Sequence, residues 1–175
     1  MKRALHIITI MVCLLFTTVC FAATAKEIKE LENKAEQGDA DAQFSLGRIY
    51  SQGEGVKQDY VKARKWYEAA AAQGNAAAQN NLGAMYFDGK KARQDYAKAQ
   101  EWWEKAAAQG HGTAQYNLGR IYYYGYGVEQ DYDKAKEWFG EACDNGHKKG
   151  CEIYKEMNKE RSIFDPGKFF NLLKP

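Results

Sequence analysis

Apolar side chains recur along most of the chain at the spacing of amphipathic helices, in paired segments that end at glycine. In the first segment, Ala42, Leu46 and Tyr50 follow at four-residue intervals, and Gly53 then interrupts the pattern. A second apolar face begins after Asp59 and comprises Tyr60, Ala63, Trp66, Tyr67 and Ala70. Aspartate favours the start of a helix and glycine its end. The pattern therefore predicts two antiparallel helices, over 39–52 and 60–73.

The whole pattern returns every 36 residues. Gln37-Gly38 recurs as Gln73-Gly74 and Gln109-Gly110, Leu46-Gly47 as Leu82-Gly83 and Leu118-Gly119, and Asp59-Tyr60 as Asp95-Tyr96 and Asp131-Tyr132. A fixed period in this range is typical of stacked helix hairpins. The sequence predicts three repeats, over 39–74, 75–110 and 111–146, between an N-terminal capping helix over 26–38 and a C-terminal capping helix and tail over 147–175.

Two repeated positions suggest how the helices of a hairpin pack. Gly47, Gly83 and Gly119 lie inside the first helix, where glycine costs about 1 kcal/mol relative to alanine. We expect the paired helix to approach closely there, over Ala63, Ala99 and Ala135. The larger side chains of Trp66, Trp102 and Trp138 are expected to fill the space between neighbouring hairpins.

Residues 1–25 have the pattern of a secretory signal peptide. A positive start is followed by an apolar run to Phe21 and then by small residues from Ala22 to Ala25. Cleavage after Ala22 and cleavage after Ala25 are both compatible with this pattern. An uncleaved membrane anchor is the alternative, since about 18 apolar residues could just span a bilayer. We predict a periplasmic or secreted protein with no membrane span after cleavage.

The charge balance limits the class of partner. The chain has 25 Lys and Arg residues against 23 Asp and Glu residues, and without Lys2 and Arg3 the two signs balance at 23 each. Because binding to a polyanion needs an excess of positive charge, the sequence argues against a nucleic-acid partner. A hydrophobic content of 45% is ample for a packed core.

Four cysteines are divided by the predicted signal peptide. Cys13 and Cys20 lie within it, whereas Cys143 and Cys151 belong to the part that remains. An even pair in an exported protein most simply forms a disulfide, and two separate buried thiols are the alternative. We therefore predict a disulfide between Cys143 and Cys151.

The repeated unit resembles the Sel1-like repeat, a relative of the tetratricopeptide repeat. The resemblance is carried by Ala-Gln-Asn-Asn-Leu-Gly-Ala-Met-Tyr from Ala78 to Tyr86, by Gly125-Tyr126-Gly127-Val128, by Asp131 and by the stretch from Lys134 to Phe139. It implies an all-α fold, a right-handed α-solenoid of antiparallel helix hairpins. The middle copy departs from the pattern at its turn, Gly89-Lys90-Lys91-Ala92, which lacks the second glycine. The cysteine spacing resembles that of the Helicobacter cysteine-rich proteins, which are Sel1-like proteins with such a pair in each repeat.

The sequence offers no constellation of catalytic residues. None of Ser45, Ser51 and Ser162 is followed three residues later by the lysine that serine β-lactamases need. His111 and His147 occupy the repeat position that holds Asn75 in another copy, which indicates a polar role at a helix start. We predict no catalytic residue, no cofactor and no bound metal ion.

The resemblance implies a binding surface instead. In the related tetratricopeptide fold the first helix of each hairpin lines the concave face. Carrying those positions over by their offset from the Leu-Gly pair gives Phe44, Arg48, Asn80, Phe87, Asp88, Tyr116, Arg120, Tyr123 and Tyr124, with Tyr126 in the adjoining turn. The repeats differ at these positions, as expected where packing does not dictate the residue. Tyrosine and arginine make good interface anchors because they bury a large area and carry polar tips.

These observations predict an exported, non-catalytic scaffold, adaptor or regulator that binds another protein or peptide, including a component of the cell envelope. Two alternatives follow from the resemblance. The first is a penicillin-binding protein or weak β-lactamase like the Helicobacter cysteine-rich proteins. The second is an immunity-type inhibitor of a toxin.

Overall fold

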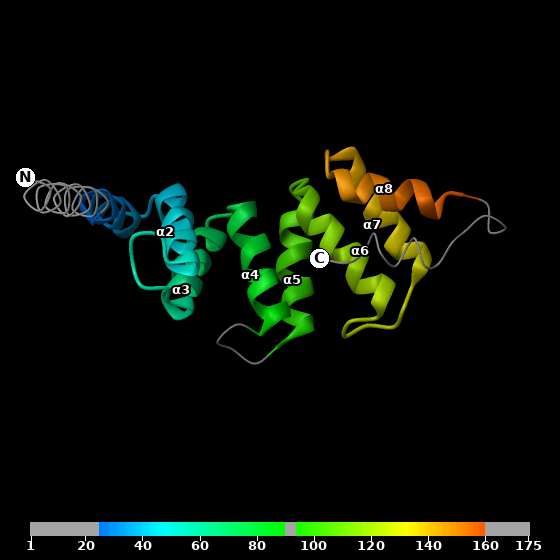
Figure 1. Ribbon diagram of the computed structural model, residues 1–175, viewed down its shortest axis with the longest axis horizontal. Helices are drawn as coiled ribbons and strands as arrows, with labels where there is room; N and C mark the ends of the chain where they lie inside the picture. The colour runs from blue at the N-terminus through cyan, green and yellow to red at the C-terminus, as the bar shows by residue number, and fades with distance from the viewer. Residues whose placement is uncertain (1–24, 90–93, 160–175) are drawn as a thin grey trace, which may run out of the picture. The chain divides into compact units, whose positions relative to one another are not determined.

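The computed structural model describes residues 25–89 and 94–159, and every regular element within these ranges is an α-helix. The predicted signal peptide, apart from residue 25, lies outside the described residues, as do the turn at 90–93 and the tail over 160–175. A first helix, described over 25–36, is followed by seven more (Figure 1), which are α2 (Ala40–Gln52), α3 (Tyr60–Ala72), α4 (Ala76–Asp88), α5 (Tyr96–Ala107), α6 (Gly112–Tyr124), α7 (Tyr132–Asp144) and α8 (Lys148–Met157). The predicted all-helical class is confirmed.

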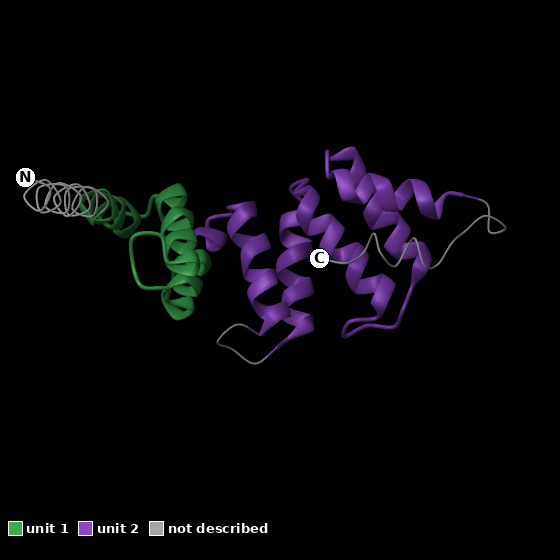
Figure 2. Ribbon diagram, in the orientation of Figure 1, with its two compact units in different colours: residues 1–69 green, residues 70–175 purple. Residues whose placement is uncertain are grey.

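The chain divides into two compact units, over 1–69 and 70–175, which Figure 2 colours separately. In unit 1, residues 25–36 are joined to α2 by two hydrogen bonds. Tyr50 donates its hydroxyl to Glu32, and Gln43 donates to the carbonyl of Ala35, both at 2.9 Å. In unit 2, each helix from α4 to α8 packs against the next helix in chain order. The largest side chains that are fully buried in this unit are Phe139, Leu82, Leu118, Ile121 and Ile153.

Repeated polar residues begin the helices. At the first helix of each hairpin, a side chain accepts a hydrogen bond from the backbone N–H three residues later. The capping residues are Asp39, Asn75, His111 and, at α8, His147. Asp59, Asp95 and Asp131 accept in the same way from the N–H groups of Lys62, Lys98 and Lys134, so the predicted aspartate caps are confirmed. Such a cap satisfies backbone donors that have no partner inside the helix.

A glycine inside each first helix faces an aromatic ring, and here the packing differs from the expected one. A Cβ on Gly119 would lie 2.6 Å from the Phe139 ring, and a Cβ on Gly83 would lie 2.5 Å from the Trp103 ring. Gly47 faces the Tyr67 ring in the same way. The expected partners, Ala63, Ala99 and Ala135, are fully buried nearby but do not set the close approach.

The tryptophans expected to fill the space between hairpins are only half-buried. Trp66, Trp102 and Trp138 each stand one residue before the ring that covers the glycine. One step along a helix turns a side chain by about 100°, because a full turn takes 3.6 residues. The tryptophans therefore lie at the edge of the core. Trp138 packs against its outside, and Trp102 lies beneath the ammonium group of Lys105 at 4.2 Å.

A buried glutamine ties each hairpin to the helix before it. In unit 2, Gln79 and Gln115 are 5% and 3% exposed, and they donate to the carbonyls of Ala71 and Ala107, eight residues earlier. Their side-chain oxygens accept from Gln109 at 2.8 Å and from Asn145 at 3.1 Å, respectively. Each amide thus uses both its donor and its acceptor, as a buried polar group must if it is not to cost stability.

Cys143 in α7 and Cys151 in α8 form a disulfide, as the sequence predicted. They lie 36 residues after Ala107 and Gln115, the pair joined by a hydrogen bond in the preceding copy. The covalent bond therefore occupies the place that the glutamine bond holds elsewhere in the repeat array.

Replacing Gly119 by alanine should destabilise the protein. The new methyl group would meet the buried Phe139 ring, and overpacking of this kind costs about 1–3 kcal/mol, which outweighs the gain of about 1 kcal/mol in helix propensity. The measurement is the urea midpoint of the Gly119→Ala variant. Gly140→Ala is the matched control, because its methyl group would reach only the half-buried Tyr154 ring at 3.1 Å. Equal midpoints for the two variants would refute the role assigned to the glycine.

Removing the disulfide should lower the free energy of unfolding by about 2–3 kcal/mol, which is the loop-closure value for a short closed loop. Cys143→Ser with Cys151→Ser, compared with the oxidised chain, provides the measurement. The double variant should also become insensitive to a thiol reductant. An oxidised chain that melts at the same temperature as the variant would contradict this expectation.

Candidate functional site

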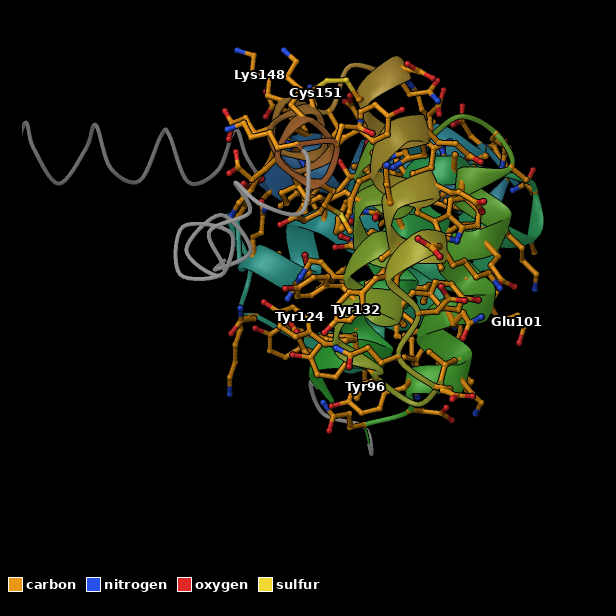
Figure 3. All side chains as sticks on the ribbon, turned by 90° about the vertical axis from the view of Figure 1, so that its right-hand side faces the viewer. Tyr96, Glu101, Tyr124, Tyr132, Lys148 and Cys151 are labelled. Carbon is orange, nitrogen blue, oxygen red and sulfur yellow. A yellow bond between two sulfur atoms is a disulfide. The ribbon has the colours of Figure 1, made fainter. Side chains whose placement is uncertain are left out.

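Six aromatic side chains come together at one end of unit 2. They belong to the end of α4, the start of α5, the end of α6, the following turn and the start of α7. We call them the aromatic cluster: Phe87, Tyr96, Tyr123, Tyr124, Tyr126 and Tyr132. Figure 3 shows Tyr96, Tyr124 and Tyr132 at this end, away from Lys148 and Cys151.

The rings of the aromatic cluster contact one another in an unbroken series. Tyr126 lies 5.1 Å from Phe87, 5.4 Å from Tyr96 and 5.2 Å from Tyr124, measured between ring centroids. Tyr123 continues the series at 5.0 Å from Tyr124 and 5.2 Å from Tyr132. Tilted and edge contacts at these distances are favourable arrangements for aromatic rings. The cluster therefore presents a preformed surface.

The turn between α6 and α7 allows this convergence. Gly125 ends α6 in the left-handed conformation at φ 70°, and Gly127 follows at φ 74°. A side chain on Gly127 would collide with the Cβ of Tyr96 at 2.7 Å, so the missing side chain lets Tyr126 stack on Tyr96. Beneath the surface, Phe87 also contacts the buried ring of Trp103 at 5.5 Å, which fixes the cluster to the core.

Arg120 lies beside the aromatic cluster, on α6. Its guanidinium carbon is 5.7 Å from the ring centroid of Phe87 and 6.0 Å from that of Tyr116. The positive charge of Arg120 acts to lower the pKa of Tyr116 and of Tyr124, but burial, the larger effect, raises both pKa values above the ordinary 10.0.

Burial keeps the phenols of Tyr123 and Tyr124 neutral at physiological pH, because it raises the pKa of both. Burial, with smaller contributions from Tyr132 and Tyr124, raises the pKa of Tyr123 to about 12. A neutral phenol can both donate and accept a hydrogen bond. Among the described residues, the surface therefore combines apolar rings with polar phenol tips and the adjacent cation of Arg120.

The structure brings together most of the predicted site residues of unit 2, but not all are accessible. Tyr116 is only 7% exposed and stacks on His147 at 4.5 Å, so it supports the surface from below. Asn80 accepts a hydrogen bond from the Trp103 indole through its carbonyl, at 3.1 Å. Asp88 is exposed at the end of α4.

The two predicted site residues of unit 1 have partners of their own. Phe44 packs against Tyr67, with ring centroids 6.0 Å apart. Arg48 lies 3.8 Å from Glu54, and both side chains are about half exposed. The two charged residues help to line a hollow of about 380 Å³ with Glu27, Ile28, Leu31, Ile49 and Gly55.

Sequence reasoning missed two members of the cluster, Tyr96 and Tyr132. Both stand at the first position of a second helix, where tyrosine recurs in all three repeats, and such recurrence indicates a packing role. The signal that could have identified them is the high density of tyrosines from Tyr122 to Tyr126. Such a group of rings would contact any aromatic ring at the start of an adjacent helix.

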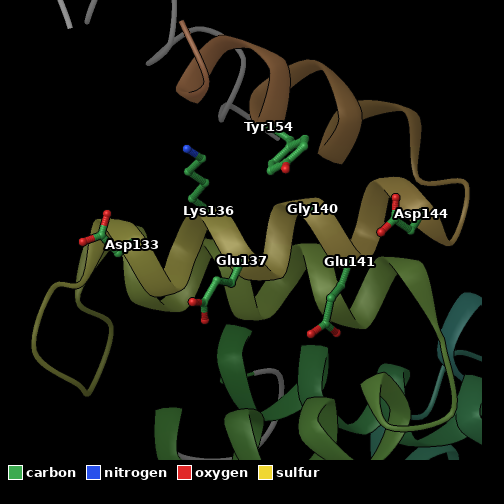
Figure 4. Close-up of a pocket in the computed structure, with 7 residues that line it drawn as sticks. All are labelled: Asp133, Lys136, Glu137, Gly140, Glu141, Asp144 and Tyr154. Carbon is green, nitrogen blue, oxygen red and sulfur yellow. The ribbon is translucent and has the colours of Figure 1, made fainter. Parts of the chain in front are cut away.

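A second hollow, of about 630 Å³, runs along the outer face of α7 beneath α8 (Figure 4). It is lined by Asp133, Lys136, Glu137, Gly140, Glu141, Asp144 and Tyr154. One of its carboxylates, Glu141, accepts a hydrogen bond from Gln115 at 3.2 Å. Over the described ranges, no group of three or more histidine, cysteine or acidic side chains could hold a metal ion.

His111 and His147, the histidines among the described residues, serve as helix caps, as the sequence indicated. The Nδ1 atom of His147 accepts from the N–H of Gly150 at 3.0 Å, and that of His111 accepts from Ala114 at 3.3 Å. Burial is the main cause that lowers the pKa of each from the ordinary 6.5, and the nearby Lys149 lowers that of His147 further. Both rings are therefore held in the neutral form that can accept.

Comparison with known proteins gives consistent matches. The sequence profile of the Sel1 repeat matches residues 40–75, 76–111 and 112–147. A solved Sel1 repeat protein from Oxalobacter formigenes is 37% identical, with a TM-score of 0.67, over 75% of this chain and 98% of that one. A protective antigen present in uropathogenic Escherichia coli strains is 34% identical, with a TM-score of 0.73, over 85% of this chain but 32% of that one.

A more distant match shows a similar fold. Cysteine-rich protein B of Helicobacter pylori is 23% identical, with a TM-score of 0.58, over 72% of this chain and 96% of that one. Comparison with curated protein sequences gave no match.

Acidification should weaken the fold through the histidine caps. A histidine whose pKa is lowered by folding binds fewer protons in the native state than in the unfolded state, so stability is full above about pH 6.5 and falls as the pH drops below it. His111→Asn with His147→Asn, which copies Asn75, should retain the caps and reduce this pH dependence. Urea midpoints at about pH 7.5 and pH 5.5 provide the measurement. An undiminished difference in the double variant would show that other groups cause it.

Proposed function

Because the chain belongs to the Sel1 repeat family, we propose that it is a non-catalytic protein-binding module whose partner docks on the aromatic cluster of unit 2. The fold class supports this proposal, since a solenoid of Sel1-like helix hairpins offers the same core with variable surface residues in each copy. The packing positions, such as the Leu-Gly pair, are constant among the repeats. The cluster positions on the first helices vary, because Phe87 and Tyr123 correspond to Ser51 in the first copy.

The aromatic cluster carries the proposal. Its rings are half-buried against one another, and Tyr132 remains 52% exposed, so a partner could cover a large apolar area without reorganising the surface. Rigid tyrosines cost little conformational entropy on binding, and tyrosine is enriched among the residues that contribute most to interface affinity.

We also propose that the protein is exported. Residues 1–25 have the composition of a signal peptide, and a disulfide persists in oxidising compartments. None of the helices within the described ranges is long and apolar enough to cross a membrane. The two alternatives drawn from the resemblance, β-lactam binding and toxin inhibition, have no specific observation in their favour.

Substitution within the site should abolish partner capture. The tagged chain would be used to retrieve partners from a cell-envelope extract, with a variant that combines Arg120→Ala and Tyr124→Ala. Loss of two interface anchors should reduce the recovered partner at least about tenfold, because truncating such residues costs more than 1 kcal/mol each.

Two controls accompany this experiment. Val61→Ser alters an exposed apolar residue on a second helix of unit 1 and should leave capture unchanged. Circular dichroism should show that every variant remains helical. If the double variant recovers the same partner in the same amount, the aromatic cluster is not the binding surface.

A further inference from the structure

Arg120 places a positive charge among aromatic rings. On α6 it lies one helical turn after Tyr116 and one turn before Tyr124, so the three side chains follow one strip of the helix. The Phe87 ring from α4 closes the other side, at 5.7 Å from the guanidinium carbon. Aromatic rings therefore surround the charge on several sides.

The charge has no counterpart in the described part of the chain. No described residue forms an ion pair or a hydrogen bond with the Arg120 guanidinium, and its Nε is the one side-chain polar atom there that is both buried and without a partner. Arg48, the residue at the same position of the first repeat, lies 3.8 Å from Glu54 instead. Contact with aromatic faces attracts the cation but leaves its N–H donors unused.

The neighbouring tyrosines do not supply a negative charge. Burial raises the pKa of Tyr116, Tyr123 and Tyr124, so all three phenols are uncharged near neutral pH. Arginine is always protonated in proteins, and a partly buried charge without a partner is costly. A site that retains this cost in the free state can recover it when an anion binds.

We propose that Arg120 binds the side-chain carboxylate of an aspartate or glutamate in the partner, and that apolar residues next to this acidic residue pack on the aromatic cluster. This inference rests on the proposed function and names the chemistry of the partner. The guanidinium offers a planar fork that pairs with a carboxylate through two parallel hydrogen bonds. Lysine, with its single charged tip, cannot reproduce this geometry.

The accessible rings lie on one side of Arg120 along α6. Tyr116, one turn before Arg120, is buried, whereas Tyr124 and the rest of the cluster follow one turn after it. A segment whose acidic side chain pairs with Arg120 can therefore also cover the exposed rings, such as Tyr132 at 52%. Covering them supplies the apolar part of the affinity.

A peptide selection tests the inference. Random 12-residue peptides displayed on phage would be selected on the purified chain, and the enriched sequences would be synthesised with acetylated and amidated ends. We expect an acidic residue next to apolar or aromatic residues. Replacing that residue by its amide should weaken binding, measured by fluorescence polarisation, about 10- to 100-fold.

Variants of the protein test whether Arg120 is the group that recognises the acidic residue. Arg120→Gln should bind the acidic peptide and its amide analogue equally, and Arg120→Lys should recover only part of the difference. Arg64→Gln, which alters an arginine that lies 3.6 Å from Glu68 on α3 of unit 1, is the matched control and should behave as the original chain. Circular dichroism establishes that each variant is folded.

The remaining outcomes separate this inference from the proposed function. One outcome is that peptides bind in a way that depends on Tyr124 while the amide analogue binds equally well. In that case the proposed carboxylate contact with Arg120 is refuted, and the proposed binding surface is retained. If only peptides with a free terminal carboxylate bind, the inferred source of the anion is wrong. If no selected peptide depends on Tyr124 or Arg120, both the inference and the proposed function fail.

Discussion

The contact between a glycine in the first helix and an aromatic ring from the second sets the packing within the hairpins. The ring differs from copy to copy, as Tyr67, Trp103 and Phe139, but each lies close to a helix backbone that has no side chain at that point. Because glycine lacks the methyl group of alanine, the ring can approach the backbone closely and make many dispersion contacts. With α4 against α5 and α6 against α7 held in this way, the ends of these four helices are fixed closely enough for six rings to meet.

Much of the fold could be predicted because local chemistry and the repeat agreed. Aspartate before the second helices and glycine after the first ones marked the helix ends, and the structure confirms these boundaries to within a residue or two. The partner of the glycine was not predictable in the same way. Periodicity identifies the face of a helix, but Trp102 and Trp103 are adjacent residues of the same size, and only the three-dimensional packing decides which of them covers Gly83.

The candidate site shows the same limit more strongly. Offsets within the repeat placed Phe87, Arg120 and Tyr124 on one surface, since they depend only on the first helices. They did not reveal that Tyr116 is sealed beneath His147, or that Tyr96 and Tyr132 join the surface from the second helices. Contacts between different helices depend on the turns that connect them, and the glycines at 125 and 127 shape such a turn. The surface is thus a property of the turn as much as of the helices.

The last connection in the array differs in kind from the others. Gln43, Gln79 and Gln115 each reach back eight residues to a backbone carbonyl, and Cys151 reaches back eight residues to Cys143. A hydrogen bond breaks and re-forms continually, whereas a disulfide is permanent until electrons are supplied. A thiol at this position cannot replace the amide, because sulfur is a weak donor and acceptor. The anchoring of α8 to α7 therefore depends on the redox state of the surroundings. An oxidising medium keeps the covalent link, and a reducing one leaves α8 held by its noncovalent packing alone.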